Sequence, residues 1–361
     1  MRQPLPAETD VRSILIISTN WIGDAVMSIP AICGVRSLYP QARISVLARS
    51  AIADLFRAVP QIDNIISFRK DKGLQRIPTI LAAAVRLRRE RFDLVLIFPR
   101  SLSTALIALL AGIPRRIGFA SGLRGALLTD ALARDAELRS LHQTHYYKRL
   151  LEPLGRPVYP ELPRLTLPPD ARHWAAETLR HKNLPTKAAL VGLNPGSTYG
   201  EAKQWLPERF AELARKLTAD GNTVIVFGDA ATGPLARAIT DAATGRVIDM
   251  SGRTSITQMA ALIERCSVLV TNDTGPMHVA CALNVPVVAV FGSTNRTTTA
   301  PADPNATIVC ADLPCSPCMQ RVCPLEHHAC MYAVTVEMVE QAVRAKLADG
   351  QNGNQSKNTW Q

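Results

Sequence analysis

Short apolar runs rich in β-branched residues alternate with longer helical stretches through most of this sequence. The run SILIIS at 13–18 is apolar at consecutive positions, which is typical of a parallel strand covered on both faces. The stretch at 22–38 has helical apolar spacing, and Pro30 within it predicts a kink or a break. Strands that alternate with helices of this length predict βαβ units and a doubly wound parallel sheet, which is an α/β fold.

The alternation runs through two successive halves. In the first half we expect strands at 44–47, 65–68 and 93–98, and helices at 50–59, 78–91 and 101–111. Prolines then gather at positions 153, 157, 160, 163, 168 and 169, which predicts an extended connection. In the second half we expect a charged helix at 171–181, then strands at 189–194, 223–227, 247–249, 268–271 and 287–291 separated by helices, and a last helix at 334–347.

These halves predict two Rossmann-like domains that face each other across a cleft. We place the first domain at 1–168, the second with the last helix at 169–349, and a polar, disordered tail at 350–361. A length of 361 residues suits two domains, because one domain holds roughly 100–200 residues. Ligands of such sheets bind at the carboxyl ends of the strands, so the residues after each strand are the candidates for function.

Composition and charge limit the classes of protein to which this chain can belong. Hydrophobic residues make up 47% of the chain, which excludes a disordered protein. The longest apolar stretch, near 104–113, is too short for a membrane span of about 20 residues, and 1–10 lacks an apolar signal core, so we expect a cytoplasmic protein. The net charge of +11 favours an acidic partner such as phosphorylated lipid, anionic membrane or nucleic acid. Aromatic residues are only 5%, which disfavours a platform for stacked bases.

The first strand is followed by TNWIGD at 19–24. Gly23 suits a tight turn, and Asp24 then lies in the first turn of the next helix. Asp24 is either a carboxylate that stabilises the helix dipole or a general base for a transfer reaction. No GxGxxG follows the strand, which disfavours a dinucleotide-dependent dehydrogenase and a nucleotide-sugar epimerase.

Polar residues also follow two strands of the second half. Pro195-Gly196-Ser197-Thr198 with Lys203 offers N–H, hydroxyl and ammonium donors for a phosphate, or else a helix cap with a solvated lysine. Asn272-Asp273-Thr274-Gly275-Pro276-Met277-His278 places more polar groups at one helix N-terminus than capping needs. His278 alone is more typical of a packed, hydrogen-bonded histidine.

The blocks NWIGD at 20–24, PGS at 195–197, KQW at 203–205 and NDTGPMHVA at 272–280 resemble glycosyltransferase family nine in their order and approximate spacing. These are the bacterial lipopolysaccharide core heptosyltransferases. The block AGIPRRIG at 111–118 is similar to the N-terminal domain of the family. The resemblance covers about 14–347, and the tryptophan and cysteine-rich blocks are more similar to type II than to type I members.

The resemblance implies a GT-B fold and inverting transfer that needs no cofactor or metal for catalysis. It implies that the second domain binds ADP-L-glycero-D-manno-heptose and that the first binds an acidic lipid A–Kdo–heptose acceptor, whose inner-core heptose receives the sugar. That acceptor is anchored in the cytoplasmic leaflet of the inner membrane, so the resemblance implies that the protein contacts this membrane peripherally. It implies no nucleic-acid partner. Carried over by motif, the resemblance implies that Asp24 is the base. It implies that Ser197, Thr198 and Lys203 contact phosphates. It also implies that the donor's sugar and diphosphate contact Asp273, Thr274, Gly275 and His278.

Two arginine groups in the first half are either solvated or bind the acidic acceptor. Arg86, Arg88, Arg89 and Arg91 end one helix, and Arg115 with Arg116 lies in a loop. Arg115 and Arg116 are the candidates for acceptor binding. Two alternatives stay open: a heptosyltransferase of another type, and a non-catalytic basic protein that binds nucleic acid or anionic membrane. The second alternative explains the charge but not the polar residues at the strand ends.

The chain has eight cysteines, of which Cys33, Cys266 and Cys281 lie in apolar segments and suit the core. A group within 310–330 contains Cys315, Cys318, Cys323 and Cys330, and disulfides are not expected in a cytoplasmic protein. These four, near His327 and His328, are numerous enough for a structural zinc site. Reduced packing thiols and redox or iron–sulfur chemistry are the alternatives.

Overall fold

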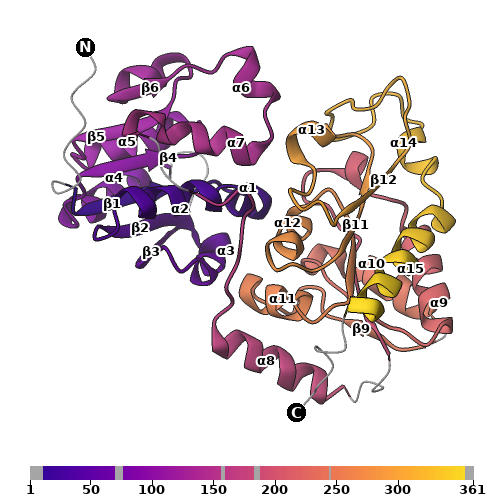
Figure 1. Cartoon of the computed structure of the whole chain (residues 1–361). Helices are drawn as coiled ribbons and strands as arrows, with labels where there is room; N and C mark the ends of the chain where they lie inside the picture. The colour runs from indigo at the N-terminus through magenta and orange to yellow at the C-terminus, as the bar shows by residue number, and fades with distance from the viewer. Residues whose placement is uncertain (1–10, 70–75, 156–158, 183–187, 244, 354–361) are drawn as a thin grey trace. The chain divides into compact units, whose positions relative to one another are not determined.

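The computed structural model describes residues 11–69, 76–155, 159–182, 188–243 and 245–353, and the chain divides into two compact units, Met1–Thr166 and Leu167–Gln361. Each unit contains one six-stranded sheet whose paired strands are all parallel (Figure 1). The predicted α/β fold with two doubly wound parallel sheets is therefore confirmed. The units divide within the proline-rich connection, of which Pro157 lies outside the described residues.

The sheet of the first unit has the strand order β3-β2-β1-β4-β5-β6. Its strands are β1 (Ser13–Ile17), β2 (Arg43–Arg49), β3 (Asn64–Phe68), β4 (Leu94–Ile97), β5 (Arg115–Phe119) and β6 (Asp130–Leu132). Its helices are α1 (Ile22–Met27), α2 (Ile29–Leu38), α3 (Ser50–Ala53), α4 (Arg76–Arg89), α5 (Leu102–Leu110), α6 (Ala136–Ser140) and α7 (Gln143–Lys148), with 3-10 turns η1 (Asp54–Ala58), η3 (Gly122–Leu127) and η4 (Arg149–Leu154).

The sheet of the second unit has the order β12-β11-β10-β7-β8-β9, which is the same winding begun again at β7. Its strands are β7 (Leu190–Asn194), β8 (Thr223–Val226), β9 (Val247–Asp249), β10 (Val268–Asn272), β11 (Val287–Phe291) and β12 (Thr307–Cys310). Its helices are α8 (Pro169–Arg180), α9 (Pro207–Ala219), α10 (Gly233–Ala242), α11 (Ile256–Ile263), α12 (Gly275–Ala282), α13 (Arg296–Thr299), α14 (Ala329–Tyr332) and α15 (Val336–Gly353), with 3-10 turns η5 (Glu201–Lys203) and η6 (Ala230–Thr232).

Local sequence chemistry explains most of these boundaries. The expected break in 22–38 occurs at Ser28, and Pro30 lies in the first turn of α2, where its missing N–H costs no helical hydrogen bond. Strands β5, β6 and β12 were not expected from the sequence; β5 begins with two arginines, which interrupt the apolar run. The last helix continues to Gly353, into the expected tail, and 354–361 lies outside the described residues.

Each sheet has its own apolar core. In the first unit α4 and α5 pack on β1 and β4 through residues such as Leu87, Val95 and Ala105. In the second unit Trp205 is fully buried, and its indole N–H donates to the carbonyl of Val334 at 2.8 Å. This hydrogen bond joins the loop after β7 to the start of α15. Truncating a buried tryptophan lowers the free energy of unfolding by roughly 3–5 kcal/mol. Within the described residues, no helix combines the length and apolarity that crossing a membrane requires.

Candidate active site

Asp24 lies at the carboxyl edge of the first sheet. The chain leaves β1 through buried Ser18 and Thr19, and Trp21 then precedes α1 with its side chain about half exposed. Asp24 is in the first turn of α1 and is partly buried. The predicted first-turn carboxylate is therefore found at the edge where parallel sheets bind ligands.

Tyr147 of α7 donates a hydrogen bond from its hydroxyl to Oδ1 of Asp24 at 3.1 Å. Helix α7 packs against α1, and the Tyr147 ring packs on Phe98 with centroids 5.4 Å apart (Figure 1). Burial raises the pKa of Tyr147 well above its ordinary value, and the charge of Asp24 raises it further. The phenol therefore keeps its proton and holds one oxygen of the Asp24 carboxylate. The sequence analysis missed Tyr147, because no local pattern links residues 123 positions apart.

Arginines surround this tyrosine pair. Burial raises the pKa of Tyr146 as it does that of Tyr147, and the charge of the exposed Arg100 partly offsets both increases. Arg124 is buried, donates to the carbonyls of Pro99, at 3.0 Å, and Phe119, and has a pKa lowered by burial. Arg124 forms no ion pair with a carboxylate of the described chain. These guanidinium groups therefore place positive charge beside the tyrosine pair, and positive charge attracts anions.

Arg115 and Arg116 lie at the amino end of β5, away from the carboxyl edge. Arg115 pairs with Asp130 at 3.2 Å and donates to the carbonyl of Pro153 at 2.8 Å. Arg116 donates to the carbonyls of Leu127, Ile113 and Pro114. The expected acceptor role of this pair finds no support in these contacts, because both guanidinium groups fasten the chain around β5.

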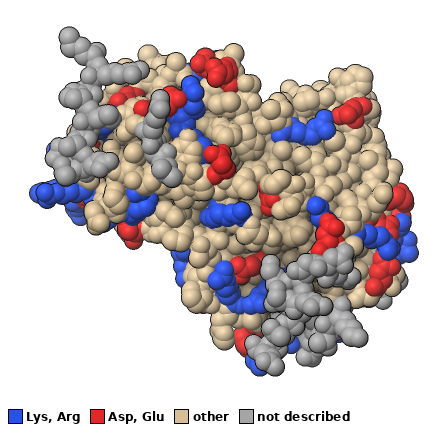
Figure 2. All heavy atoms as spheres, in the orientation of Figure 1, with Lys and Arg blue, Asp and Glu red and all other residues tan. Residues whose placement is uncertain are grey.

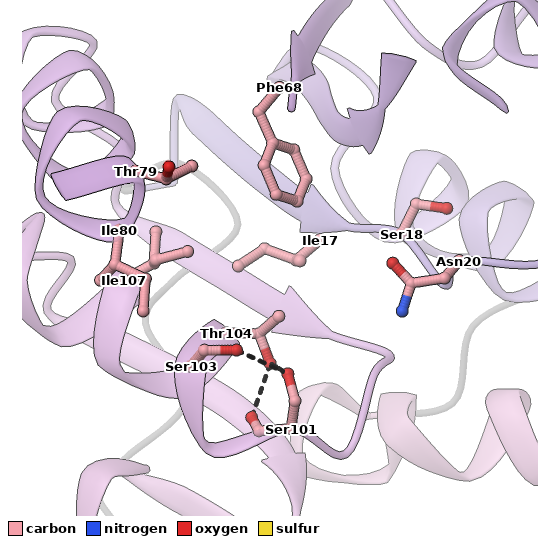
Figure 3. Close-up of a pocket in the computed structure, with 10 residues that line it drawn as sticks. All are labelled: Ile17, Ser18, Asn20, Phe68, Thr79, Ile80, Ser101, Ser103, Thr104 and Ile107. Carbon is pink, nitrogen blue, oxygen red and sulfur yellow. Dashed lines mark hydrogen bonds between the residues drawn. The ribbon is translucent and has the colours of Figure 1, made fainter. Parts of the chain in front are cut away.

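A small cavity opens beside the end of β1 (Figure 3). One part of its wall is apolar, with Ile17, Phe68 and Ile107. Another part carries the hydroxyl groups of Ser101, Ser103 and Thr104, which form two hydrogen bonds of 3.1 Å with one another. The Thr104 hydroxyl also donates to the carbonyl of Ser101 at 2.8 Å. The remaining lining residues are Ser18, Asn20, Thr79 and Ile80. A wall of this kind suits a molecule with both hydroxyl groups and apolar faces, such as a sugar.

In the second unit, Lys203 and Asp273 form a buried ion pair at the carboxyl edge of the sheet. Nζ of Lys203 lies 2.7 Å from Oδ2 of Asp273 and also donates to the Asp273 carbonyl at 3.2 Å. The hydroxyl of Thr294, after β11, donates to the same Oδ2 at 2.6 Å. The structure therefore brings together two predicted site residues that lie 70 positions apart.

Two asparagines fasten the loops around this pair. Asn194, at the end of β7, donates to the hydroxyls of Thr271 at 3.0 Å and Thr274 at 2.9 Å. Asn272, at the end of β10, accepts from the N–H of Trp205 at 2.9 Å and donates to the carbonyl of Pro195 at 2.8 Å. Thr274 precedes α12 but makes no side-chain capping bond there. The loops after β7 and β10 therefore form one rigid edge.

Two serine hydroxyls at this edge are buried without a hydrogen-bond partner in the described chain, those of Ser197 and Ser293. An unpaired buried polar group costs about 1–3 kcal/mol, and both hydroxyls are available to a ligand atom at this edge. The N-terminus of α12, with Gly275 as its first residue, also supplies N–H groups and a favourable dipole for an anion. Thr198 is exposed, and His278 is buried in the second turn of α12.

The cysteine group packs against the same edge. The thiol of Cys318 contacts the carbonyl of Ser293 at 3.9 Å, and Ser316 donates to the carbonyl of Gly292 at 2.6 Å. Burial raises the pKa of Cys330, and the nearby thiols of Cys315, Cys318 and Cys323 raise it further. All eight cysteines are free thiols, and within the described ranges no three His, Cys, Asp or Glu side chains are arranged to hold a metal ion.

Comparison with known proteins identifies relatives across nearly the whole chain. Residues 80–329 match the model of glycosyltransferase family 9 (heptosyltransferase). The chain is 31% identical to lipopolysaccharide heptosyltransferase 2 of Escherichia coli over 82% of this chain and 87% of that one. It is 30% identical to lipooligosaccharide heptosyltransferase 2 of Haemophilus influenzae over 82% and 88%. The solved E. coli ADP-heptose heptosyltransferase II superposes with a TM-score of 0.80 at 27% identity, covering 94% of this chain and 99% of that one.

Proposed function

This chain belongs to glycosyltransferase family 9, the heptosyltransferases, and we propose that it moves heptose from ADP-L-glycero-D-manno-heptose to the inner-core heptose of a lipopolysaccharide precursor. It is a glycosyltransferase of lipopolysaccharide core assembly. The first unit binds the acceptor and the second binds the donor. The contact that carries the proposal is the one between Tyr147 and Asp24, because it holds a carboxylate ready at the edge of the acceptor unit.

Asp24 acts as the general base. Its carboxylate takes the proton of the acceptor hydroxyl as that oxygen bonds to the anomeric carbon of the donor. The bond from the anomeric carbon to the ADP oxygen breaks at the same time, ADP leaves with the electron pair, and the configuration inverts. Tyr147 engages Oδ1 of Asp24, which orients the carboxylate for the acceptor.

The carboxyl edge of the second unit binds the donor. The hydroxyls of Ser197 and Thr198 and the first N–H groups of α12 donate to the diphosphate, and Gly275 at the helix start keeps that approach open. Lys203 has three N–H donors, so it bonds the diphosphate while it stays paired with Asp273. Asp273, Thr274 and His278 then contact the sugar and the inner phosphate. Developing charge on ADP is stabilised by donors that are already in place.

The acceptor is acidic, and the positive field around Tyr146 and Tyr147 attracts it. We assign this attraction to Arg100 rather than to Arg115 and Arg116, whose guanidinium groups are occupied by Asp130 and backbone carbonyls. The enzyme works at the cytoplasmic leaflet of the inner membrane, where a lipid-linked acceptor is held. The cavity beside β1 takes sugar units of that acceptor.

Transfer needs no cofactor, and any metal that the Cys315, Cys318, Cys323 and Cys330 thiols bind is a structural zinc. These thiols pack on the loop after β11 rather than on Asp24 or the Lys203–Asp273 pair. Elemental analysis of protein purified under reducing conditions measures the metal content. Chelation that removes zinc and leaves kcat unchanged supports a structural role, and loss of transfer that only added metal restores would contradict it.

The decisive experiment measures transfer and donor binding separately in Asp24→Asn. Asparagine keeps the acceptor for the Tyr147 hydroxyl but cannot take a proton, so we expect transfer, followed by mass spectrometry, to fall by roughly 10²–10⁴-fold. ADP-heptose should still raise the Tm as it does in the unsubstituted protein, and more than UDP-, GDP- or other ADP-sugars do. Retained transfer would remove Asp24 from the base role, and tight binding to nucleic acid without any transfer would favour a basic binding protein.

A further inference from the structure

The first unit exposes apolar side chains on three elements that pack side by side. Helix α4 packs against α5, and α5 packs against η3. The exposed apolar residues on them are Ile77, Leu81, Val85, Leu102, Leu109, Leu110 and Leu123. Leu123 is 85% exposed and Ile77 is 63% exposed. We call this surface the α4–α5 face. Scattered exposed apolar residues are ordinary, whereas a contiguous group of this kind marks an interaction site.

The apolar surface of helix α4 extends well beyond its core side. Ala83, Ala84 and Leu87 are buried on the core side. Ile77, Leu81 and Val85 are spaced four residues apart and form a stripe on the side that faces solvent. Helix α5, with the sequence LSTALIALL, has no charged residue to cover its own exposed leucines. Neither helix therefore matches the usual pattern of a surface helix with a polar outer side.

Positive charge borders this stripe. Arg86, Arg88 and Arg89 lie in the last turn of α4, and Arg91 follows; all four are exposed. None of them forms an ion pair with a carboxylate of the described residues. Residues 1–166 contain 24 Lys and Arg against 13 Asp and Glu, whereas 167–361 contain 17 against 17. The excess positive charge of the protein therefore lies entirely in the unit that carries the α4–α5 face.

We propose that the α4–α5 face docks on an anionic lipid bilayer, with the leucines, Ile77 and Val85 in the interfacial layer and the arginines of α4 on lipid phosphates. Apolar residues next to Arg and Lys are the pattern of a protein that lies on a membrane surface. A second copy of the chain fits this face poorly, because pairing the face with itself brings the same arginines together and like charges repel. The proposal rests on the proposed function only for the choice of leaflet.

The face and the cavity beside β1 share their helices. Thr79 and Ile80 of α4 and Ser103 and Thr104 of α5 line the cavity, while other residues of the same helices form the face (Figure 3). Docking the face on a bilayer therefore brings the cavity close to the lipid surface. An acceptor whose sugars are attached to a lipid then reaches the cavity without leaving the membrane.

The test is co-sedimentation of the full chain with vesicles that contain no acceptor, either phosphatidylcholine alone or phosphatidylcholine with a quarter phosphatidylglycerol. We expect binding to the anionic vesicles only, weakened as salt rises because the Debye length shortens from about 10 Å at 0.1 M to about 3 Å at 1 M. The triple variants Ile77→Ser/Leu81→Ser/Val85→Ser and Arg86→Gln/Arg88→Gln/Arg89→Gln should each lower the partition coefficient by about tenfold or more.

The matched control replaces three exposed apolar residues of the second unit, Val322→Ser/Leu325→Ser/Met338→Ser, and should bind vesicles like the unsubstituted protein. Transfer to a delipidated, water-soluble acceptor separates the two proposals, because the α4 variants should retain it. Unchanged vesicle binding by both α4 variants would overturn the docking proposal. So would a concentration-dependent dimer that Ile77→Ser/Leu81→Ser/Val85→Ser abolishes, since the face would then bind a second copy.

Discussion

The two units share one winding of six parallel strands and differ in what their carboxyl edges carry. In the first unit, Asp24 accepts a hydrogen bond from a neutral phenol, and a small cavity opens beside the end of β1. In the second unit, Asp273 is bonded by an ammonium group and two threonine hydroxyls, within a network that includes two asparagines. A shared fold therefore fixes where a ligand binds, and the loops decide which chemistry takes place there.

Charge divides the units in the same way. The first unit has 24 basic against 13 acidic residues, and the second unit is balanced at 17 and 17. In the view of Figure 2, Lys and Arg form separate groups and not one continuous field. Separate basic groups of this kind can each contact a different anionic group of a ligand or partner. This division of charge agrees with the proposal that the first unit binds an acidic acceptor and that the second binds the donor through local N–H and hydroxyl groups.

The largest contrast is expected from the same substitution made in both units. Asp24→Asn should lower transfer by roughly 10²–10⁴-fold. It should leave the Tm nearly unchanged, because the asparagine oxygen still accepts the hydrogen bond of the Tyr147 hydroxyl. Asp273→Asn leaves Lys203 buried without its counter-charge, which costs about 3 kcal/mol and lowers the Tm of a unit this size by roughly 6–12 °C. Calorimetry and transfer assays on both variants check this. An equal loss of Tm in the two variants would contradict the prediction that only the Asp273 carboxylate stabilises its unit through an ion pair.

A smaller effect is expected from Tyr147→Phe, which removes one hydrogen bond to Asp24 and keeps the ring. The net free energy of such a hydrogen bond is about 0.5–1.5 kcal/mol, and losing it should lower kcat by roughly 2–10-fold. KM for ADP-heptose should stay the same, and the pH profile of kcat should shift, because Asp24 loses a donor that stabilises its charged form. A purely structural role for Tyr147 would leave the pH profile in place, and Phe98→Leu is a control for packing on the same ring.

A further effect concerns one thiol in each unit, Cys33, which is partly buried, and Cys281, which is buried. Burial raises the pKa of Cys33 to about 11 and that of Cys281 to about 12, against 9.0 for an exposed thiol. A raised folded pKa means that the unfolded chain ionises first, so stability is intact below pH 9 and falls as pH rises through 9 to 12. Equilibrium unfolding between pH 8 and pH 11 should show this decline, and Cys281→Ala should reduce it. A decline that is the same in Cys281→Ala would assign it to other groups, such as the buried Tyr147.

The residues at the strand ends were predictable, whereas their partners were not. Apolar runs locate the strands, so the polar residues that follow them, such as Asp24 and Asp273, could be picked out as candidates. Lys203 was expected on a phosphate and is held by Asp273, and Arg115 was expected on the acceptor and is held by Asp130. These partners lie 70 and 15 positions away in the chain, beyond the reach of any local pattern.

The sequence by itself determined the α/β winding of both halves, because hydrophobic periodicity is a local property that each strand and helix records separately. It also identified the family blocks and the overall positive charge. Only the tertiary structure placed the Tyr147 hydroxyl on Asp24, confined the cavity between α4, α5 and the end of β1, and joined the exposed residues of three elements into one face. These features depend on distances between residues far apart in the chain, and such distances exist only once the sheets have formed.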